Sequence, residues 1–283
     1  MTDERLTSRA DDDSCKVQKR RVATVLGVNV DMVTLSELLD TIERAVQKRE
    51  HAIIAHVNVH AINLAYSLPW FRDFLNRCDL VFCDGFGVKW GARLLGYRLP
   101  GRFTPPDWLP LLAQRCATRH YTLYLLGARP GVAKRAGHRL QADYPQLNIV
   151  GVHHGHFDHS LSSADTEAVV RAINEVSPDI LIIGFGMPLQ EQWLKDNWDR
   201  LQVRVALPVG AAFDFLSGRV PRGPRWATDR GLEWLTRLFT EPRRLWRRYL
   251  IGNPLFLLRI VRQRLGWLPA REKSHALHRA DLR

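Results

Sequence analysis

The stretch that decides the fold is residues 121–152, YTLYLLGARPGVAKRAGHRLQADYPQLNIVGV. Its apolar run Tyr121–Leu126 predicts a buried strand, which ends in a turn of small residues at 127–131. A segment of helical periodicity follows and stops before Tyr144-Pro145, and Asn148–Val152 predicts the next strand. A strand, a helix and a strand in this order form a βαβ unit, so the stretch predicts two parallel strands in one sheet.

The same alternation continues on both sides of this unit. A capping-box pattern at Thr34 and Glu37 predicts the start of the first helix. Further strands are predicted at Val22–Val30 (a strand or hairpin), His51–Val57, Leu80–Cys83, Ile180–Ile183 and Val203–Leu207. Further helices are predicted at Leu35–Val46, Val59–Tyr66, Gly85–Leu95, Ala164–Val176 and Leu189–Asp199. Residues 21–219 are therefore expected to form an α/β domain with a doubly wound, mostly parallel sheet and helices on both faces.

The two ends of the chain differ from this core. Residues 1–20 are charged and rich in serine, which predicts a mobile polar tail. After Gly218 the strand signals stop, and Trp, Leu and Arg recur at helical spacing. Three helices are predicted there, at Gly231–Thr240, Pro242–Ile251 and Pro254–Leu265, with breaks at Glu241-Pro242 and Gly252-Asn253-Pro254. Residues 220–283 are expected to be a helical appendage.

Charge is concentrated in that appendage. The chain has 41 Lys and Arg against 29 Asp and Glu, and residues 220–283 hold 15 of the cations and only 5 of the anions. Because the arginines there alternate with Trp, Leu and Phe, we expect a basic amphipathic surface that binds an anionic membrane. Nucleic acid would attract the same charge, but no helix-turn-helix, zinc-finger or RNA-recognition signature is present, so no nucleic-acid partner is expected.

Two further patterns bear on where the protein resides. No apolar run approaches the roughly 18 residues of a membrane-spanning helix, and the polar N-terminus lacks the apolar region of a secretory signal. The four cysteines form no CxxC pair, and three of them lie among apolar residues, which is typical of reduced, buried thiols. We therefore expect an intracellular protein.

Ligands of parallel sheets bind at the carboxyl ends of the strands, so the residues after each strand are the candidate site. Asp84 follows one strand directly and precedes Gly85, whose backbone can approach a ligand closely. It is either a general base or simply the N-cap of the next helix, and spacing alone does not decide. His56 and Asn58 end another strand and are weaker candidates for contact with a ligand.

Small residues follow the other strands too. Gly127 lies in a turn that matches neither dinucleotide nor P-loop fingerprints, and Gly184, Gly186 and Gly210 occupy two more strand ends. Gln190 and Glu191 begin the helix after Gly186. They either bind a ribose or uracil edge or merely complement the helix dipole. Repeated small-residue turns of this kind favour a nucleotide-type ligand.

The absent motifs narrow the chemistry. DxD occurs only in the acidic run at 11–13, and HExxH, clustered Cys/His ligands and Gly-x-Ser-x-Gly are missing. We therefore predict no metal site and no cofactor. If a diphosphate leaves from this site, arginines are expected to stabilise its charge.

Taken together, the motifs resemble those of the WecG/TagA/CpsF glycosyltransferases, glycosyltransferase family 26. The resemblance extends from about residue 24 to 250, in the family's order, and no single motif carries it. The matching stretches are Cys83–Val88, Arg93–Gly96, Leu126–Gly127, Gly184–Glu191, Gly210–Gly218, Gly231–Leu235 and Glu241–Arg244.

The resemblance implies a membrane-associated, metal-independent, inverting enzyme. Such an enzyme moves a sugar from a UDP-sugar to a polyprenyl-diphosphate-linked sugar, in bacterial cell-surface or exopolysaccharide synthesis. It implies that Asp84 is the general base, and that Gln190 and Glu191 lie in the UDP pocket. It also implies that an appendage folds over the site as a peripheral element on the cytoplasmic face of the inner membrane. The appendage arginines that approach the diphosphate would be Arg237, Arg244 and Arg247. A homo-oligomer is compatible with these expectations.

One position departs from the family's pattern. Many members have threonine two residues before the asparagine of the early strand-end motif, where this chain has His56. An imidazole can donate, accept or carry a proton, so His56 is expected either to orient the donor sugar or to assist Asp84. The sugar expected is glucose or N-acetylmannosamine. The alternative class is a basic nucleotide- or nucleic-acid-binding protein without transferase activity.

Overall fold

The computed structural model describes residues 21–221, 223 and 233–267, without the side chains of Glu233, Arg237 and Arg244. The predicted tail at 1–20 and the appendage segments 224–232 and 268–283 lie outside the described residues.

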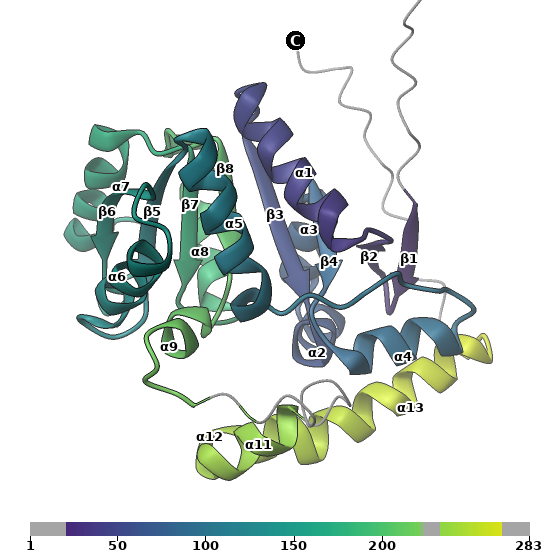
Figure 1. Cartoon of the computed structure of the whole chain (residues 1–283). Coiled ribbons are helices and arrows are strands. Elements are labelled where there is room, and N and C mark those ends of the chain that lie inside the picture. Colours follow the sequence, from purple (N-terminus) through teal and green to yellow (C-terminus); the bar gives the residue numbers. More distant parts are fainter. Residues whose placement is uncertain (1–20, 222, 224–232, 268–283) are drawn as a thin grey trace, which may run out of the picture.

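The core is a six-stranded sheet in the order β4-β3-β8-β7-β5-β6 (Figure 1), and every neighbouring pair in it is parallel. Its strands are nearly all apolar and buried, as expected for a sheet covered on both faces. The bounds are β3 Ala52–Val57, β4 Leu80–Cys83, β5 Thr122–Gly127, β6 Asn148–His153, β7 Ile180–Gly184 and β8 Val205–Pro208. The predicted parallel α/β sheet is confirmed.

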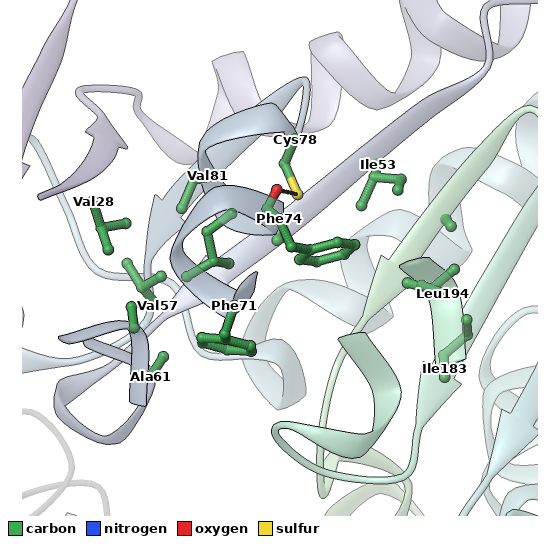
Figure 2. Packing of buried hydrophobic residues seen from close by; sticks show 14 of the residues in the cluster. Val28, Ile53, Val57, Ala61, Phe71, Phe74, Cys78, Val81, Ile183 and Leu194 are labelled. Atoms are coloured by element: carbon green, nitrogen blue, oxygen red, sulfur yellow. Dashed lines mark hydrogen bonds between the residues drawn. The ribbon is translucent and has the colours of Figure 1, made fainter. Parts of the chain in front are cut away.

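Helices cover both faces of this sheet. One face packs against α1 Leu35–Gln47, α5 Pro105–Arg119 and α6 Val132–Asp143. The other packs against α3 Pro69–Arg77, α7 Ala164–Val176 and α8 Leu189–Asn197, which a short 3₁₀ turn, Trp198–Arg200, extends. Figure 2 shows part of this second core, where Phe71 and Phe74 of α3 lie beside β3 and Leu194 of α8 lies beside β7. The doubly wound arrangement is therefore also confirmed.

The N-terminal hairpin and the first helix form as predicted. Strands β1 Val22–Val25 and β2 Val28–Asp31 pair antiparallel, with Leu26 and Gly27 at positive φ in the turn. The Asp31 carboxylate accepts a hydrogen bond from the Val81 N–H at 2.6 Å, which fastens the hairpin to the edge strand β4. Thr34 and Glu37 form the capping box of α1.

Two core helices, α3 and α5, were not expected from the sequence. Each begins with proline, and α5 also contains Pro110 in its interior. Proline is favourable in the first turn of a helix, where the missing N–H has no helical partner. Elsewhere in a sequence it predicts the end of a helix. The prolines therefore obscured helices that tertiary packing supports.

The remaining helices lie at the carboxyl edge of the sheet, toward which the strand arrowheads point (Figure 1). They are α2 Val59–Ser67, α4 Phe86–Leu94, α9 Ala212–Leu216, α11 Glu233–Thr240, α12 Pro242–Trp246 and α13 Gly252–Arg264. The predicted break at Glu241-Pro242 separates α11 from α12.

The predicted break at 252–254 is wrong. The chain passes from α12 through a π-helical turn, Arg247–Ile251, directly into α13. Pro254 is the third residue of α13, and the wider ladder of a π turn can leave room for a proline ring and its missing N–H. The sequence pattern carried no sign of this turn.

Helix α13 is docked tightly on the core. Phe256 and Ile260 are buried against Gly91 of α4, where an added Cβ would lie 2.6 Å from the Phe256 ring. At its other end, Gln263 accepts a hydrogen bond from the Leu26 N–H at 2.9 Å and donates one to the Thr24 carbonyl at 3.1 Å. Helix α13 is thereby joined to the β1–β2 hairpin.

Candidate active site

A cavity of about 890 Å³ lies at the carboxyl edge of the sheet. Its core side is formed by residues that follow β3, β4, β5, β7 and β8, and its other side by α11, the π turn and α13. The expectation that ligand-contacting residues gather at the strand ends matches the position of this cavity. Residues of α11 to α13 thus form the appendage wall of the cavity, and Figure 1 shows these helices beneath the strands.

Asp84 lies in this cavity beside the other two candidates from the early strand ends. Its Oδ2 accepts a hydrogen bond from the Asn58 side-chain amide at 3.1 Å and lies 3.6 Å from His56 Nε2. The parallel pairing of β3 with β4 brings these residues together from 26 and 28 positions apart in the sequence. Asn58 also caps α2, accepting from the backbone N–H groups of His60 and Ala61.

The structure assigns the helix-capping position to another residue. Gly85, not Asp84, occupies the N-cap of α4, and no side chain caps that helix. The Asp84 side chain is about 13% exposed and lines the cavity instead. The geometry is thus that expected of a carboxylate available to a ligand.

His56 is a buried, neutral imidazole at this site. Its Nδ1 lies 2.9 Å from the Pro208 carbonyl oxygen, which can only accept, so Nδ1 carries the proton. Burial lowers the pKa of His56 to about 4, with a smaller contribution from Arg248. The contact with Asp84 is therefore not an ion pair at neutral pH, and His56 presents the unprotonated Nε2 to the carboxylate.

The glycines at the strand ends permit close backbone packing. Gly127 (φ +145°) ends β5 so near β7 that an added Cβ would lie 2.6 Å from the Gly184 backbone. Gly184 in turn packs against the Gly210 carbonyl and Phe213. The cavity is lined by Gly85, Gly184, Gly186 and Gly210. Gly127 does not line it, but the next two residues, Ala128 and Arg129, do.

This packing predicts a difference between two glycine substitutions. Gly127→Ala is expected to lower the free energy of unfolding by more than about 2 kcal/mol, because the new methyl group meets backbone that cannot move aside. Gly186→Ala, at φ +93° with open space around it, is expected to cost only about 1 kcal/mol of backbone strain. Urea unfolding of both variants measures this difference, and equal losses would contradict the packing argument.

Gln190 and Glu191 do not reach the cavity surface. Both are buried, and the Gln190 side-chain oxygen accepts hydrogen bonds from the Gly186 N–H (3.2 Å) and the Gly210 N–H (3.0 Å). The Gln190 amide donates to Glu191 Oε1 at 2.7 Å. The structure therefore places the two residues behind the wall, where they hold two strand-end loops together.

The burial of Glu191 makes the stability of the protein depend on pH. Its Oε2 is buried without a hydrogen-bond partner among the described residues, and burial raises the pKa of Glu191 to about 7. The protonated form is favoured in the folded protein, so the stability it contributes is complete below the ordinary pKa of 4.5 and is lost as the pH rises through 7.

Glu191→Gln mimics the protonated side chain and should remove that loss. We expect the unfolding free energy of the variant, relative to the parent, to rise by about 3 kcal/mol between about pH 4.5 and pH 8. Denaturant unfolding across this range is the measurement. A pH-independent difference would show that Glu191 is charged in the folded state.

Among the described side chains, those of Arg102, Arg129, Arg219 and Arg248 line the cavity. Arg219 pairs with Asp214 at 2.7 Å, and the Arg102 guanidinium lies 4.5 Å from the centre of the Phe86 ring. Arg247, in contrast, is exposed and lies over Trp246. The side chains of Arg237 and Arg244 are outside the described residues.

Sequence reasoning missed Arg102 and Arg248. A π turn holds one more residue than an α-turn, so it shifts which side chains face a given direction, and Arg248 rather than its neighbour Arg247 lines the cavity. Arg102 lies in a loop without periodicity, and nothing in its spacing marked it.

No group of three His, Cys, Asp or Glu side chains arranged to hold a metal ion occurs in the described part of the chain. Within those same residues, no helix has the length and apolar character needed to cross a bilayer.

The parallel six-stranded sheet and the cavity at its carboxyl edge define an α/β protein with a candidate ligand site at the strand ends. The model of the glycosyl transferase WecG/TagA/CpsF family matches residues 23–269, so the chain belongs to that family. The resemblance read from the motifs is confirmed, and of the two classes left open, the transferase is supported.

Similar proteins include three from Staphylococcus aureus, of strains MRSA252, NCTC 8325 / PS 47 and COL. Each is named an N-acetylglucosaminyldiphosphoundecaprenol N-acetyl-beta-D-mannosaminyltransferase. Each is 28% identical over 244 residues, which cover 84% of this chain and 91% of the relative.

Proposed function

We propose that this protein is an inverting, metal-independent glycosyltransferase of bacterial cell-surface or exopolysaccharide synthesis. It moves N-acetylmannosamine or glucose from a UDP-sugar to a sugar linked to polyprenyl diphosphate, the acceptor type in the names of its relatives. The observation that carries the proposal is the position of Asp84, in a large cavity beside Asn58 and among arginines.

The chemistry is a single displacement. The Asp84 carboxylate accepts the proton of the acceptor hydroxyl, whose oxygen attacks C1 of the donor sugar from the side opposite UDP. The C1–oxygen bond to UDP breaks, and the diphosphate leaves with the electron pair. A new bond joins C1 to the acceptor oxygen, and the configuration at C1 is thereby inverted. Asn58 holds the Asp84 carboxylate in place by donating a hydrogen bond from its amide. His56 carries its proton on Nδ1, which bonds to the Pro208 carbonyl, so it does not protonate Asp84.

Arginines supply the charge stabilisation in this scheme. Arg102, Arg129 and Arg248 line the cavity, so a diphosphate bound there would lie among their guanidinium groups. A guanidinium carries its charge at every pH of interest and matches phosphate oxygens with paired N–H groups. These contacts support a reaction that needs no divalent ion. Arg237, Arg244 and Arg247 remain proposed for the same role from the appendage.

The surface of the appendage supports attachment to a membrane. Apolar side chains that are largely exposed gather on it, and Arg243, Arg247, Arg262 and Arg264 are exposed on the same helices. The apolar side chains are Phe239, Trp246, Leu250, Ile251, Leu258, Val261, Leu265 and Trp267. A helical surface with this mixture suits the interface of an anionic bilayer. We propose a peripheral protein on the cytoplasmic face, where nucleotide sugars are made.

The test is direct transfer. The purified protein is incubated with UDP-N-acetylmannosamine, UDP-glucose or other UDP-sugars, a short-chain prenyl-diphosphate N-acetylglucosamine acceptor, and a chelator. UDP release shows turnover and identifies the donor, and the one-bond carbon–proton coupling at C1 of the product reports its anomeric configuration. Release of UDP only without the chelator, or a product with retained configuration, would overturn the corresponding part of the proposal.

A further inference from the structure

The outer rim of the cavity is built from two apolar rows. On α4, Phe86 and Trp90 line the cavity, and Leu94 follows one turn further on. On α13, Leu257 lines the cavity, and Val261 and Leu265 follow at the same spacing. Residues four apart lie on one face of a helix, so each row runs from the cavity outward for about 12 Å.

Both rows face solvent although they are apolar. Trp90 is 58% exposed and Leu257 is 48% exposed, yet both also line the cavity, so they mark the place where it opens to the surface. The two helices pack directly on one another through Phe256, Ile260 and Gly91, and lie side by side in Figure 1. The rows are thus the two sides of one apolar path that begins inside the site.

The order of groups along this path matches an amphiphile with a charged middle. Asp84 is followed directly by Gly85 and Phe86, and all three residues line the cavity. The Arg102 guanidinium lies 4.5 Å from the centre of the Phe86 ring, and that ring lies 6.2 Å from Trp90. A sugar at Asp84 would place its diphosphate near Arg102, and a hydrocarbon tail attached to that diphosphate would meet Trp90 next.

We infer that the rows on α4 and α13 bind the first isoprene units of the lipid acceptor, with Trp90 and Leu257 as the two sides of the exit. The inference rests on the proposed function for the nature of the acceptor. The inference adds that the protein binds the prenyl chain of the acceptor directly, in addition to any attachment to the bilayer. Trp90 belongs to the core helix α4, not to the appendage, so this subsite joins the two parts of the molecule around one substrate.

The kinetic test uses soluble acceptors without vesicles or detergent, so that membrane attachment contributes nothing. The acceptors are N-acetylglucosamine diphosphates that carry either a farnesyl or an ethyl group. The parent protein is expected to prefer the farnesyl acceptor at least tenfold in kcat/KM. Trp90→Ala and Leu257→Ala are each expected to lose about tenfold on the farnesyl acceptor and nothing on the ethyl acceptor.

Two control variants make the result specific. Trp90→Phe keeps an aromatic side and should retain most of the preference. Val176→Ala shortens an exposed apolar residue at the far end of α7 and should change neither acceptor. Equal losses on both acceptors, or no loss on the farnesyl acceptor, would overturn the inference. If the path binds membrane acyl chains instead, Trp90→Ala and Leu257→Ala would show no loss on the farnesyl acceptor and would lose only vesicle binding.

A binding experiment separates this inference from the proposed function. Farnesyl diphosphate and inorganic pyrophosphate are titrated into the protein in a calorimeter. Trp90→Ala should weaken farnesyl diphosphate about tenfold and leave pyrophosphate unchanged. If the parent moves no sugar but shows this difference, the proposed function fails and the prenyl subsite stands. If the parent moves sugar but Trp90 does not affect farnesyl diphosphate, or farnesyl diphosphate does not bind, the subsite fails and the function stands.

Discussion

Asp84→Asn is expected to reduce sugar transfer by about 10³-fold while the protein stays folded. Asparagine has the same shape as aspartate and can still accept the hydrogen bond from Asn58, so the local structure should persist. It cannot accept a proton from the acceptor hydroxyl at neutral pH. Initial rates of UDP release, measured with saturating donor and acceptor, give the loss, and thermal unfolding verifies the fold.

A second carboxylate in the cavity supplies the control. Asp214 also lines it but is paired with Arg219 at 2.7 Å. Asp214→Asn removes the same charge from the same space and should cost less than tenfold in kcat. If Asp84→Asn retains most of its activity while Asp214→Asn does not, the base has been assigned to the wrong residue.

Arg248→Ala should slow transfer by about 10²-fold, which is the usual effect of removing one preorganised donor to a developing negative charge. Arg248 reaches the cavity from the π turn, and its charge is felt at both His56 and His60. Because the loss falls on the transition state, kcat should change more than the KM of the donor. Arg248→Lys should recover only part of the rate, since an ammonium cannot form paired contacts with phosphate.

Arg243→Ala is the matched control for Arg248→Ala. Arg243 is exposed on α12 and is absent from the cavity wall, so the variant removes an equal charge from the same appendage. It is expected to weaken binding to anionic vesicles and to leave solution kinetics nearly unchanged. A loss in Arg247→Ala that exceeds that of Arg248→Ala would instead favour the sequence-based assignment of the diphosphate to Arg247.

The sequence predicts the core well because its strands are buried on both faces. Such strands are continuous apolar runs, and most of them are followed by a glycine or a polar residue, so the strand bounds Leu80–Cys83 agree with the structure. The gathering of Asp84, Asn58 and His56 follows from the same reasoning, because parallel strands end at one edge of the sheet.

What the sequence could not predict depends on three-dimensional packing. The sequence leaves open whether Gln190 and Glu191 contact a ligand or complement the helix dipole, because the direction of a polar side chain at a helix start depends on the loops around it. The π turn at Arg247–Ile251 leaves no periodic signal, yet it decides which arginine lines the cavity. The sequence also does not mark Trp90 as a cavity residue, because a single apolar residue on a surface helix has no distinguishing pattern.

The link between Gln263 and the turn at Leu26 has a consequence for biosynthesis. It joins positions 237 residues apart, so during synthesis Leu26 is made long before Gln263, and the contact forms only after α13 has been made. A fragment that stops before α13 would therefore lack both this contact and the α13 part of the cavity wall.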